Sequence, residues 1–326
     1  MRRWLWRFGA FAAVPVIALV LWPAEPVDTA IEADPSDIAA VGAGGLDAWL
    51  AAEEARFDDI TPGVEKRIVW ATAPGAATDE VVVYIHGFSA TSEELRPVPD
   101  RVAQALGANL LFWRLAGHGR GGDAMAEPRA GDWIEDMAEA LAVADLLGDR
   151  VTVIATSTGG TLAAIAATLP ETRGAFDRLV MVSPNFRIAA PVARVLTWPA
   201  VRHWGPLVVG AERRFESLNA AHGRYWTTRY PTVATVPMGA LVAHARALDY
   251  SVVAIPALFV FSDADRVVSA AATREVAARW GGDVTLAPQV PGPGDDPFAH
   301  VLAGDILSPS LTPGVSALIL DWIAAH

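Results

Sequence analysis

Short apolar runs alternate along most of this chain with longer segments whose apolar residues recur at helical spacing. Runs of four or five aliphatic, aromatic or β-branched residues are typical of strands buried on both faces of a parallel sheet. We expect such strands near 81–85, 109–113, 151–154, 179–182, 257–261 and 284–287, and an edge strand near 65–71. We expect helices near 46–57, 93–106, 133–147, 162–169, 270–280 and 315–324. This alternation predicts an α/β domain with a mostly parallel sheet and helices on both faces.

One interval, residues 185–251, breaks the alternation. It contains five prolines and three tryptophans, with helical patches but no clear sheet strand. Because it lies between two predicted core strands, we interpret it as an insertion that packs over the carboxyl edge of the sheet as a cap. A helical subdomain that contacts no ligand is the alternative.

The N-terminus differs from the rest of the chain. Three arginines precede an uncharged apolar run, residues 8–22, and tryptophans flank that run. Acidic residues follow it, and positive charge before an apolar segment predicts a cytoplasmic N-terminus with the body on the other side. We therefore expect a transmembrane anchor at 1–22, a linker at 23–45 and the α/β domain at 46–326. A cleaved signal peptide, and hence a secreted protein, is the alternative.

Composition narrows the function classes. The chain has 326 residues, 52% of them hydrophobic and 19% charged, so it is not a disordered protein. Its net charge of −12 argues against a nucleic-acid partner and against an extended electrostatic contact between the body and anionic lipid. It has no cysteine, which excludes disulfides, thiolate metal sites and a cysteine nucleophile.

Ser157 is the first candidate for chemistry. It lies in a cluster of small residues between a predicted buried strand and a helix-forming segment. A serine at such a strand–turn–helix junction can present its hydroxyl at the sheet edge, beside the free N–H groups of a helix N-terminus. The usual motif has glycine two residues earlier, where this chain has Ala155. A simple serine cap of the following helix is the other interpretation.

A serine nucleophile needs donors for the oxyanion, a base and an acid that orients the base. The strand at 81–85 ends in a turn whose glycine would aim the backbone N–H of Phe88 toward Ser157, and the N–H of Thr158 would be the second donor. We expect His86, in the same turn, to be a structural histidine that is hydrogen-bonded to the loop backbone.

Two acids and one histidine could complete the set. Asp263 and Asp265 both follow the apolar run at 257–261, at the sheet edge where ligand crevices form. Of the seven histidines, only His300 lies after these acids, before the final helix, and in a Gly/Pro loop behind the last strand. The order Ser…Asp…His is that of a known hydrolase fold.

Taken together, these motifs resemble the α/β-hydrolase-fold serine hydrolases, in particular the bacterial esterase, lysophospholipase and monoglyceride-lipase branch. The resemblance rests on motifs within residues 80–305: His86-Gly-Phe-Ser89, Gly117-His-Gly119, Thr156-Ser-Thr-Gly-Gly160, Asp263-Ala-Asp-Arg-Val-Val268 and His300. It implies a Ser157–His300–Asp265 triad, since Asp265 directly precedes Arg-Val-Val, and backbone donors at Phe88 and Thr158. Two positions depart from the family pattern. Ala155 bears on the geometry of the turn, and we expect the loop that begins at Arg114 to affect substrate preference more than chemistry.

The resemblance implies acyl transfer through an acyl-enzyme, with no metal and no cofactor. The expected enzyme is a carboxylic ester hydrolase, acting on lipophilic esters such as acylglycerols or lysophospholipids. An amidase or peptidase using the same triad, and a non-catalytic ligand-binding protein of the same fold, are the alternatives. The expected partners are the small lipophilic substrate and, through the N-terminal helix, a membrane, with no nucleic acid.

Overall fold

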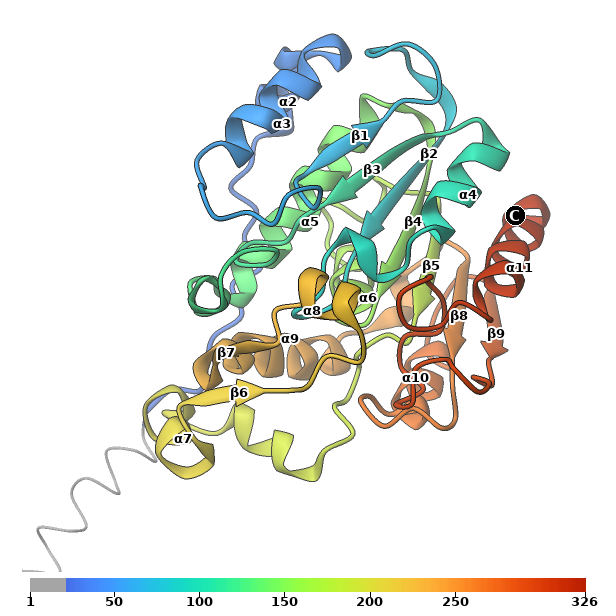
Figure 1. Cartoon of the computed structure of the whole chain (residues 1–326). Coiled ribbons are helices and arrows are strands. Elements are labelled where there is room, and N and C mark those ends of the chain that lie inside the picture. Colours follow the sequence, from blue (N-terminus) through green and yellow to red (C-terminus); the bar gives the residue numbers. More distant parts are fainter. Residues whose placement is uncertain (1–21) are drawn as a thin grey trace, which may run out of the picture.

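Seven strands form the central sheet of the computed structural model, which describes residues 22–326 (Figure 1). The strands lie in the order β1-β3-β2-β4-β5-β8-β9, and all neighbours are parallel except β1, which pairs antiparallel with β3 at one edge. Their bounds are β1 Arg67–Val69, β2 Thr78–Ile85, β3 Asn109–Trp113, β4 Gly148–Thr156, β5 Arg178–Val182, β8 Ala257–Phe261 and β9 Val284–Pro288. The predicted mostly parallel sheet is confirmed.

The apolar runs divide between two hydrophobic cores because successive side chains of a strand point to opposite faces. In β2, Val81 and Val83 join the larger core, whereas Val82 and Tyr84 join the smaller one on the other face. A run of consecutive apolar residues is therefore what a strand covered on both faces requires.

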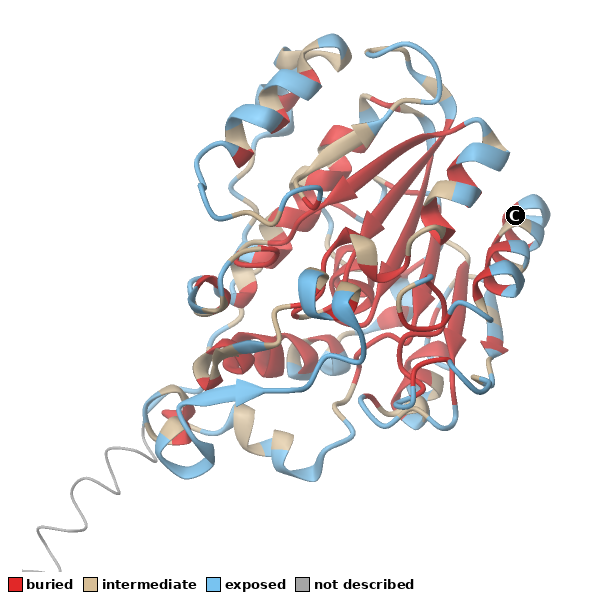
Figure 2. Cartoon of the chain, viewed as in Figure 1, coloured by how far each residue is buried: buried red, intermediate tan, exposed pale blue. Residues whose placement is uncertain are grey.

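Helices cover both faces of this sheet (Figure 1). Side chains of α5, α6, α9 and α10 enter the larger core, and those of α4 and α11 enter the smaller one. The helices are α2 Pro35–Val41, α3 Leu46–Glu54, α4 Val98–Leu106, α5 Ala130–Asp145, α6 Thr158–Ala166, α7 Val201–Val209, α8 Ala220–Tyr225, α9 Thr235–Ala247, α10 Ala270–Ala277 and α11 Thr312–Ala325. The strands are buried along the centre of the molecule, and exposed residues lie mainly on outer helices and loops (Figure 2).

The cap, residues 185–251, contains more regular structure than its sequence indicated. It includes η4 (Pro191–Thr197), α7, α8 and α9, together with two strands, β6 (Glu212–Arg214) and β7 (Arg229–Pro231), which pair as an antiparallel ribbon apart from the main sheet. The strands are three residues long, too short to show a clear alternation. Helix α9 packs against α5 and α6, so the end of the cap belongs to the larger core.

The segment predicted as a linker, 23–45, is packed against the domain. It contains α2, which lies against α5. Before α2, the N–H groups of Glu32 and Ala33 both donate to the carboxylate of Glu135 on α5. Glu25 accepts hydrogen bonds from Arg129, which precedes α5, and from Arg202 on α7. The segment therefore connects the domain to the cap.

The predicted transmembrane anchor, 1–22, lies outside the described residues except for Trp22. Within 22–326, no helix is both long enough and apolar enough to cross a bilayer. The anchor stays a prediction from the sequence.

Candidate active site

Ser157 occupies a sharp turn between β4 and α6. Its backbone has φ 51° and ψ −113°, in a region that side chains rarely adopt, and its N–H donates to Val182 O at 2.9 Å. Its side chain makes no capping hydrogen bond to α6, which removes the interpretation of Ser157 as a simple helix cap. Ala155, at the position where glycine is usual, lies fully buried in β4 beside Ile85 and Met181. The strained turn therefore forms with alanine there.

The structure brings Ser157, His300 and Asp265 together. The Nε2 atom of His300 lies 3.1 Å from Ser157 Oγ, and its Nδ1 atom lies 2.8 Å from Asp265 Oδ2. These are hydrogen-bond distances, and they connect residues as far apart in sequence as 157 and 300. This arrangement is what a nucleophile, a base and an orienting acid require.

Asp265 is held rigidly, whereas Asp263 is not part of the arrangement. The second oxygen of Asp265, Oδ1, accepts hydrogen bonds from the N–H groups of Val267 at 2.7 Å and Val268 at 2.9 Å. Asp263 points outward, with 65% of its side chain exposed, and pairs with Arg274 on α10. The geometry therefore agrees with the choice of Asp265.

A third acid, Asp296, organises the loop that carries His300. Its Oδ2 accepts from the N–H groups of His300 at 3.0 Å and Val301 at 2.9 Å, and its Oδ1 accepts from Phe298 N at 3.0 Å. The hydroxyl of Ser183 donates to His300 O at 2.6 Å. Asp296 does not stand out in the sequence, because an acid in a Gly/Pro loop is also what an ordinary turn contains.

The surroundings of His300 favour its protonated form. Burial alone would lower the pKa of this histidine, but the charge and hydrogen bond of Asp265, with smaller contributions from Glu94 and Asp296, raise it above its ordinary value of 6.5. These charges stabilise the imidazolium that forms when the histidine takes a proton from the serine.

The loop after β2 lies directly against the Ser157 turn. A Cβ atom added to Gly87 would lie 3.1 Å from Ser157 Cβ, and one added to Gly159 would lie 2.4 Å from Ile85 O. Only glycine allows the two backbones to approach so closely. The N–H of Thr158 is at the first position of α6, where helical N–H groups lack intrahelical acceptors. Among residues 22–326, neither it nor the N–H of Phe88 donates to a protein acceptor.

His86 serves the same loop. Its Nε2 accepts a hydrogen bond from Leu115 N at 3.2 Å, so the ring proton lies on Nδ1, which donates to Gly87 O at 2.8 Å. Burial lowers the pKa of His86 well below its ordinary value, so the ring is neutral. This geometry fits the predicted structural role.

Glu94, on η2 (Ser92–Glu94), is a buried acid beside the site that sequence reasoning missed. Its carboxylate accepts from Gly87 N at 2.6 Å and from the Tyr84 hydroxyl at 3.3 Å, and that hydroxyl lies 3.1 Å from Thr156 Oγ1. Burial, the dominant cause, raises the pKa of Glu94 to about 7. In the sequence, Glu94 resembled an ordinary acid at the start of a helix, with no sign that it turns inward.

Arg114, the other departure from the family motif, is buried away from solvent. Its guanidinium binds both oxygens of Glu54 on α3, at 2.7 and 2.8 Å, and donates to His118 O at 3.0 Å. These contacts fix the loop that follows β3. They give Arg114 a structural role, and the expected effect of this loop on substrate preference stays a prediction.

The cap contacts the loops that carry the site. The N–H of Thr227 donates to Ser89 O at 2.7 Å, and the rings of Tyr230 and Phe88 meet edge to face at 5.4 Å. Trp226 forms a small apolar cluster with Ala90 and with residues that follow His300. The cap therefore adjoins both sides of the candidate site.

Among the described residues, no group of three or more acids and histidines could hold a metal ion.

A family model described as serine aminopeptidase, S33 (Hydrolase_4) matches residues 76–288. This match covers most of the chain and includes the β2 loop, the Ser157 turn and Asp265. The chain belongs to this family. The predicted resemblance to serine hydrolases of the α/β-hydrolase fold is thereby confirmed.

Solved structures of the same fold agree with this assignment. A chain from the work on the metagenome-derived lipolytic enzymes LipS and LipT matches with a TM-score of 0.66 at 21% identity, over 82% of this chain and 100% of that one. Paleococcus ferrophilus monoacylglycerol lipase matches with a TM-score of 0.56 at 16% identity, over 80% of this chain and 99% of that one. A soluble variant of the Saccharomyces cerevisiae monoglyceride lipase matches with a TM-score of 0.58 at 12% identity, over 80% of this chain and 91% of that one. At these identities the likeness establishes the fold. Comparison with curated proteins gives no match.

Proposed function

We propose that this protein is a serine-dependent carboxylic ester hydrolase that uses Ser157, His300 and Asp265. The observation that carries the proposal is the continuous hydrogen-bonded path from Ser157 Oγ through His300 to Asp265, at 3.1 and 2.8 Å. A non-catalytic member of the fold would not require a histidine and an acid to be hydrogen-bonded in sequence to a serine with a strained backbone.

In the proposed reaction, Ser157 Oγ attacks the ester carbonyl carbon while His300 Nε2 takes the serine proton. The N–H groups of Phe88 and Thr158 bind the resulting oxyanion. The intermediate collapses, the bond to the alcohol breaks, and His300 gives its proton to the departing oxygen. Water then attacks the acyl-enzyme with His300 as base, which releases the acid and restores the serine. Asp265 orients the imidazole throughout.

We propose lipophilic esters, of the acylglycerol or lysophospholipid type, as substrates. Two of the fold neighbours named above are lipases of monoacylglycerols. We also propose, from the sequence alone, that the catalytic domain lies on the non-cytoplasmic side of a membrane or is secreted.

A matched pair of substrates tests the reaction class. The detergent-solubilised full chain is given the same acyl group as a p-nitrophenyl ester and as a p-nitroanilide, with an aminoacyl anilide as a third substrate. We expect turnover of the ester to exceed that of both anilides, and activity to rise from acetyl to octanoyl esters. Faster cleavage of the aminoacyl anilide would favour a peptidase instead, in keeping with the family's description.

A further inference from the structure

The cap carries positive charge on an acidic protein. Between residues 185 and 251 there are eight arginines and no lysine, against two glutamates and one aspartate, which gives +5. The whole chain carries −12, so the remainder carries −17. Glu25 and Glu275, outside this range, pair with Arg202 and with Arg187 and Arg246, which leaves a surplus of +3. The net charge of the chain, which argued against contact with anionic lipid, therefore conceals a basic region.

The same part of the molecule exposes large apolar side chains. Leu207 and Val208, at the end of α7, are 86% and 71% exposed. Val192 on η4 and Trp198 just after it are more than half exposed, and Trp198 lies beside Trp204 of α7, with ring centroids 6.1 Å apart. Single exposed apolar residues are ordinary, but several on adjoining elements mark an interaction surface. Figure 2 shows β6 and the end of α7 as exposed.

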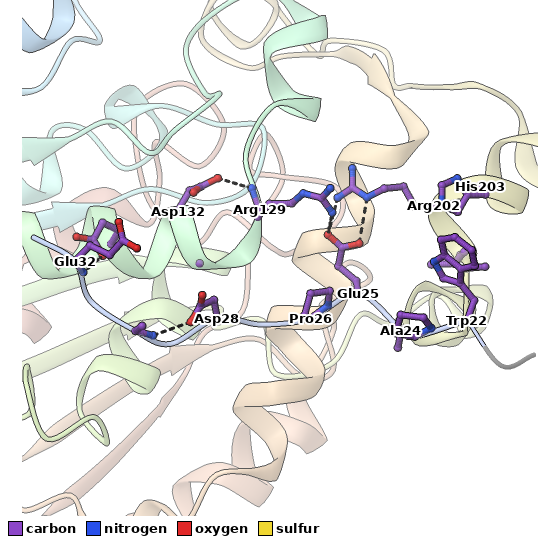
Figure 3. Close-up of a pocket in the computed structure, with 16 residues that line it drawn as sticks. Trp22, Ala24, Glu25, Pro26, Asp28, Glu32, Arg129, Asp132, Arg202 and His203 are labelled. Carbon is purple, nitrogen blue, oxygen red and sulfur yellow. Dashed lines mark hydrogen bonds and ion pairs between the residues drawn. The ribbon is translucent and has the colours of Figure 1, made fainter. Parts of the chain in front are cut away.

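The N-terminal segment enters the described structure at this surface. The ring of Trp22 meets His203 of α7 edge to face at 5.4 Å, and Trp22 is itself half exposed. Three residues later, Glu25 accepts from Arg202 at 2.7 and 3.1 Å and from Arg129 (Figure 3). Burial opposes ionisation of Glu25, but the hydrogen bonds from the two arginines hold its pKa below the ordinary value. The apolar run 8–22 thus ends beside α7.

We propose that this part of the cap docks onto the surface of an anionic lipid membrane. The docking face consists of Trp22, Val192, Trp198, Leu207 and Val208. Tryptophan and aliphatic side chains partition into the membrane interface, and nearby arginines are attracted by anionic headgroups. Arg194 and Arg213 suit this role because both are exposed and neither forms an ion pair within residues 22–326. Docking would hold the cap, and the site beneath it, at the lipid surface.

The absence of native cysteine allows a single label to test this proposal. Leu207→Cys carries an environment-sensitive nitrobenzoxadiazole label in the full-length chain. The control is Val290→Cys, equally exposed at 86%, in the loop after β9. With vesicles of phosphatidylcholine and phosphatidylglycerol, we expect a blue shift and a fluorescence increase of about twofold or more at position 207 and none at 290. Pure phosphatidylcholine or high salt should reduce the response.

Two further comparisons separate docking from other occupants. Arg194→Gln and Arg213→Gln in the Leu207→Cys background should each lower the partition coefficient between vesicle and water by about fivefold. A label at 207 that stays in water while the protein floats with the vesicles overturns the proposal. So does a blue shift without vesicles, which would mean that a second copy or residues 1–21 cover the face.

Discussion

Replacing Asp265 by asparagine tests how the acid acts on the histidine. Oδ1 of Asp265 accepts two backbone N–H groups, at 2.7 and 2.9 Å, so an asparagine must place its carbonyl oxygen there. Its NH₂ group then faces Nδ1 of His300, which lies 2.8 Å from the present Oδ2. Nδ1 must become an acceptor, and the ring proton moves to Nε2, where it faces Ser157 Oγ. A histidine in that tautomer cannot take the serine proton.

We therefore expect Asp265→Asn to reduce kcat by about 10³–10⁴-fold, equivalent to about 4–5.5 kcal/mol of transition-state stabilisation, with little change in KM. The assay is hydrolysis of p-nitrophenyl butyrate over a range of concentrations. The control is Asp263→Asn, which removes only an exposed pair with Arg274 and should change kcat less than about twofold. A loss confined to Asp263→Asn, or an Asp265→Asn variant within tenfold of wild type, would refute the reasoning.

Three more predictions follow from the surroundings of the site. When ionised, Glu94 raises the pKa of His300, and the neutral histidine is the active base, so Glu94→Gln should move the acid limb of the kcat/KM profile to lower pH. The control is Glu93→Gln, whose carboxylate pairs with Arg67 and Arg96, and it should leave the limb in place. In the wild type, that limb should have its midpoint above 6.5, because the pKa of His300 is raised; a midpoint below 6.5 contradicts this. Gly159→Ala should destabilise the fold by about 1–3 kcal/mol in urea unfolding, because its Cβ would lie 2.4 Å from a β2 carbonyl oxygen; an unchanged midpoint would mean that the loop yields without cost.

The sequence predicted those parts of the fold that depend on burial along single elements. The strands at 109–113 and 257–261 have the predicted bounds, because a fully buried parallel strand needs an unbroken apolar run. The ribbon of β6 and β7 and the packing of 23–45 depend on contacts between distant residues, such as Glu25 with Arg202. A pattern along the chain does not contain those contacts.

The same distinction holds for the site. Position along the chain was enough to select Ser157 and His300, whereas the choice of Asp265 over Asp263 came from the family motif in which the acid directly precedes Arg-Val-Val. Glu94 and Asp296 act through backbone N–H groups that only the folded loops bring to them. Their residue type and position are also those of ordinary helix starts and turns, and so the sequence did not distinguish them.

Covalent labelling of Ser157 tests the central claim most directly. The full-length chain is treated with a fluorophosphonate, and the modified residue is mapped by peptide mass spectrometry in the wild type, in Ser157→Ala and in heat-denatured wild type. Only a serine activated by its neighbours reacts rapidly with this reagent. We predict one adduct, on Ser157, in the native wild type and none in the other two samples. An adduct on another serine, or undiminished labelling of Ser157→Ala, would contradict the assignment.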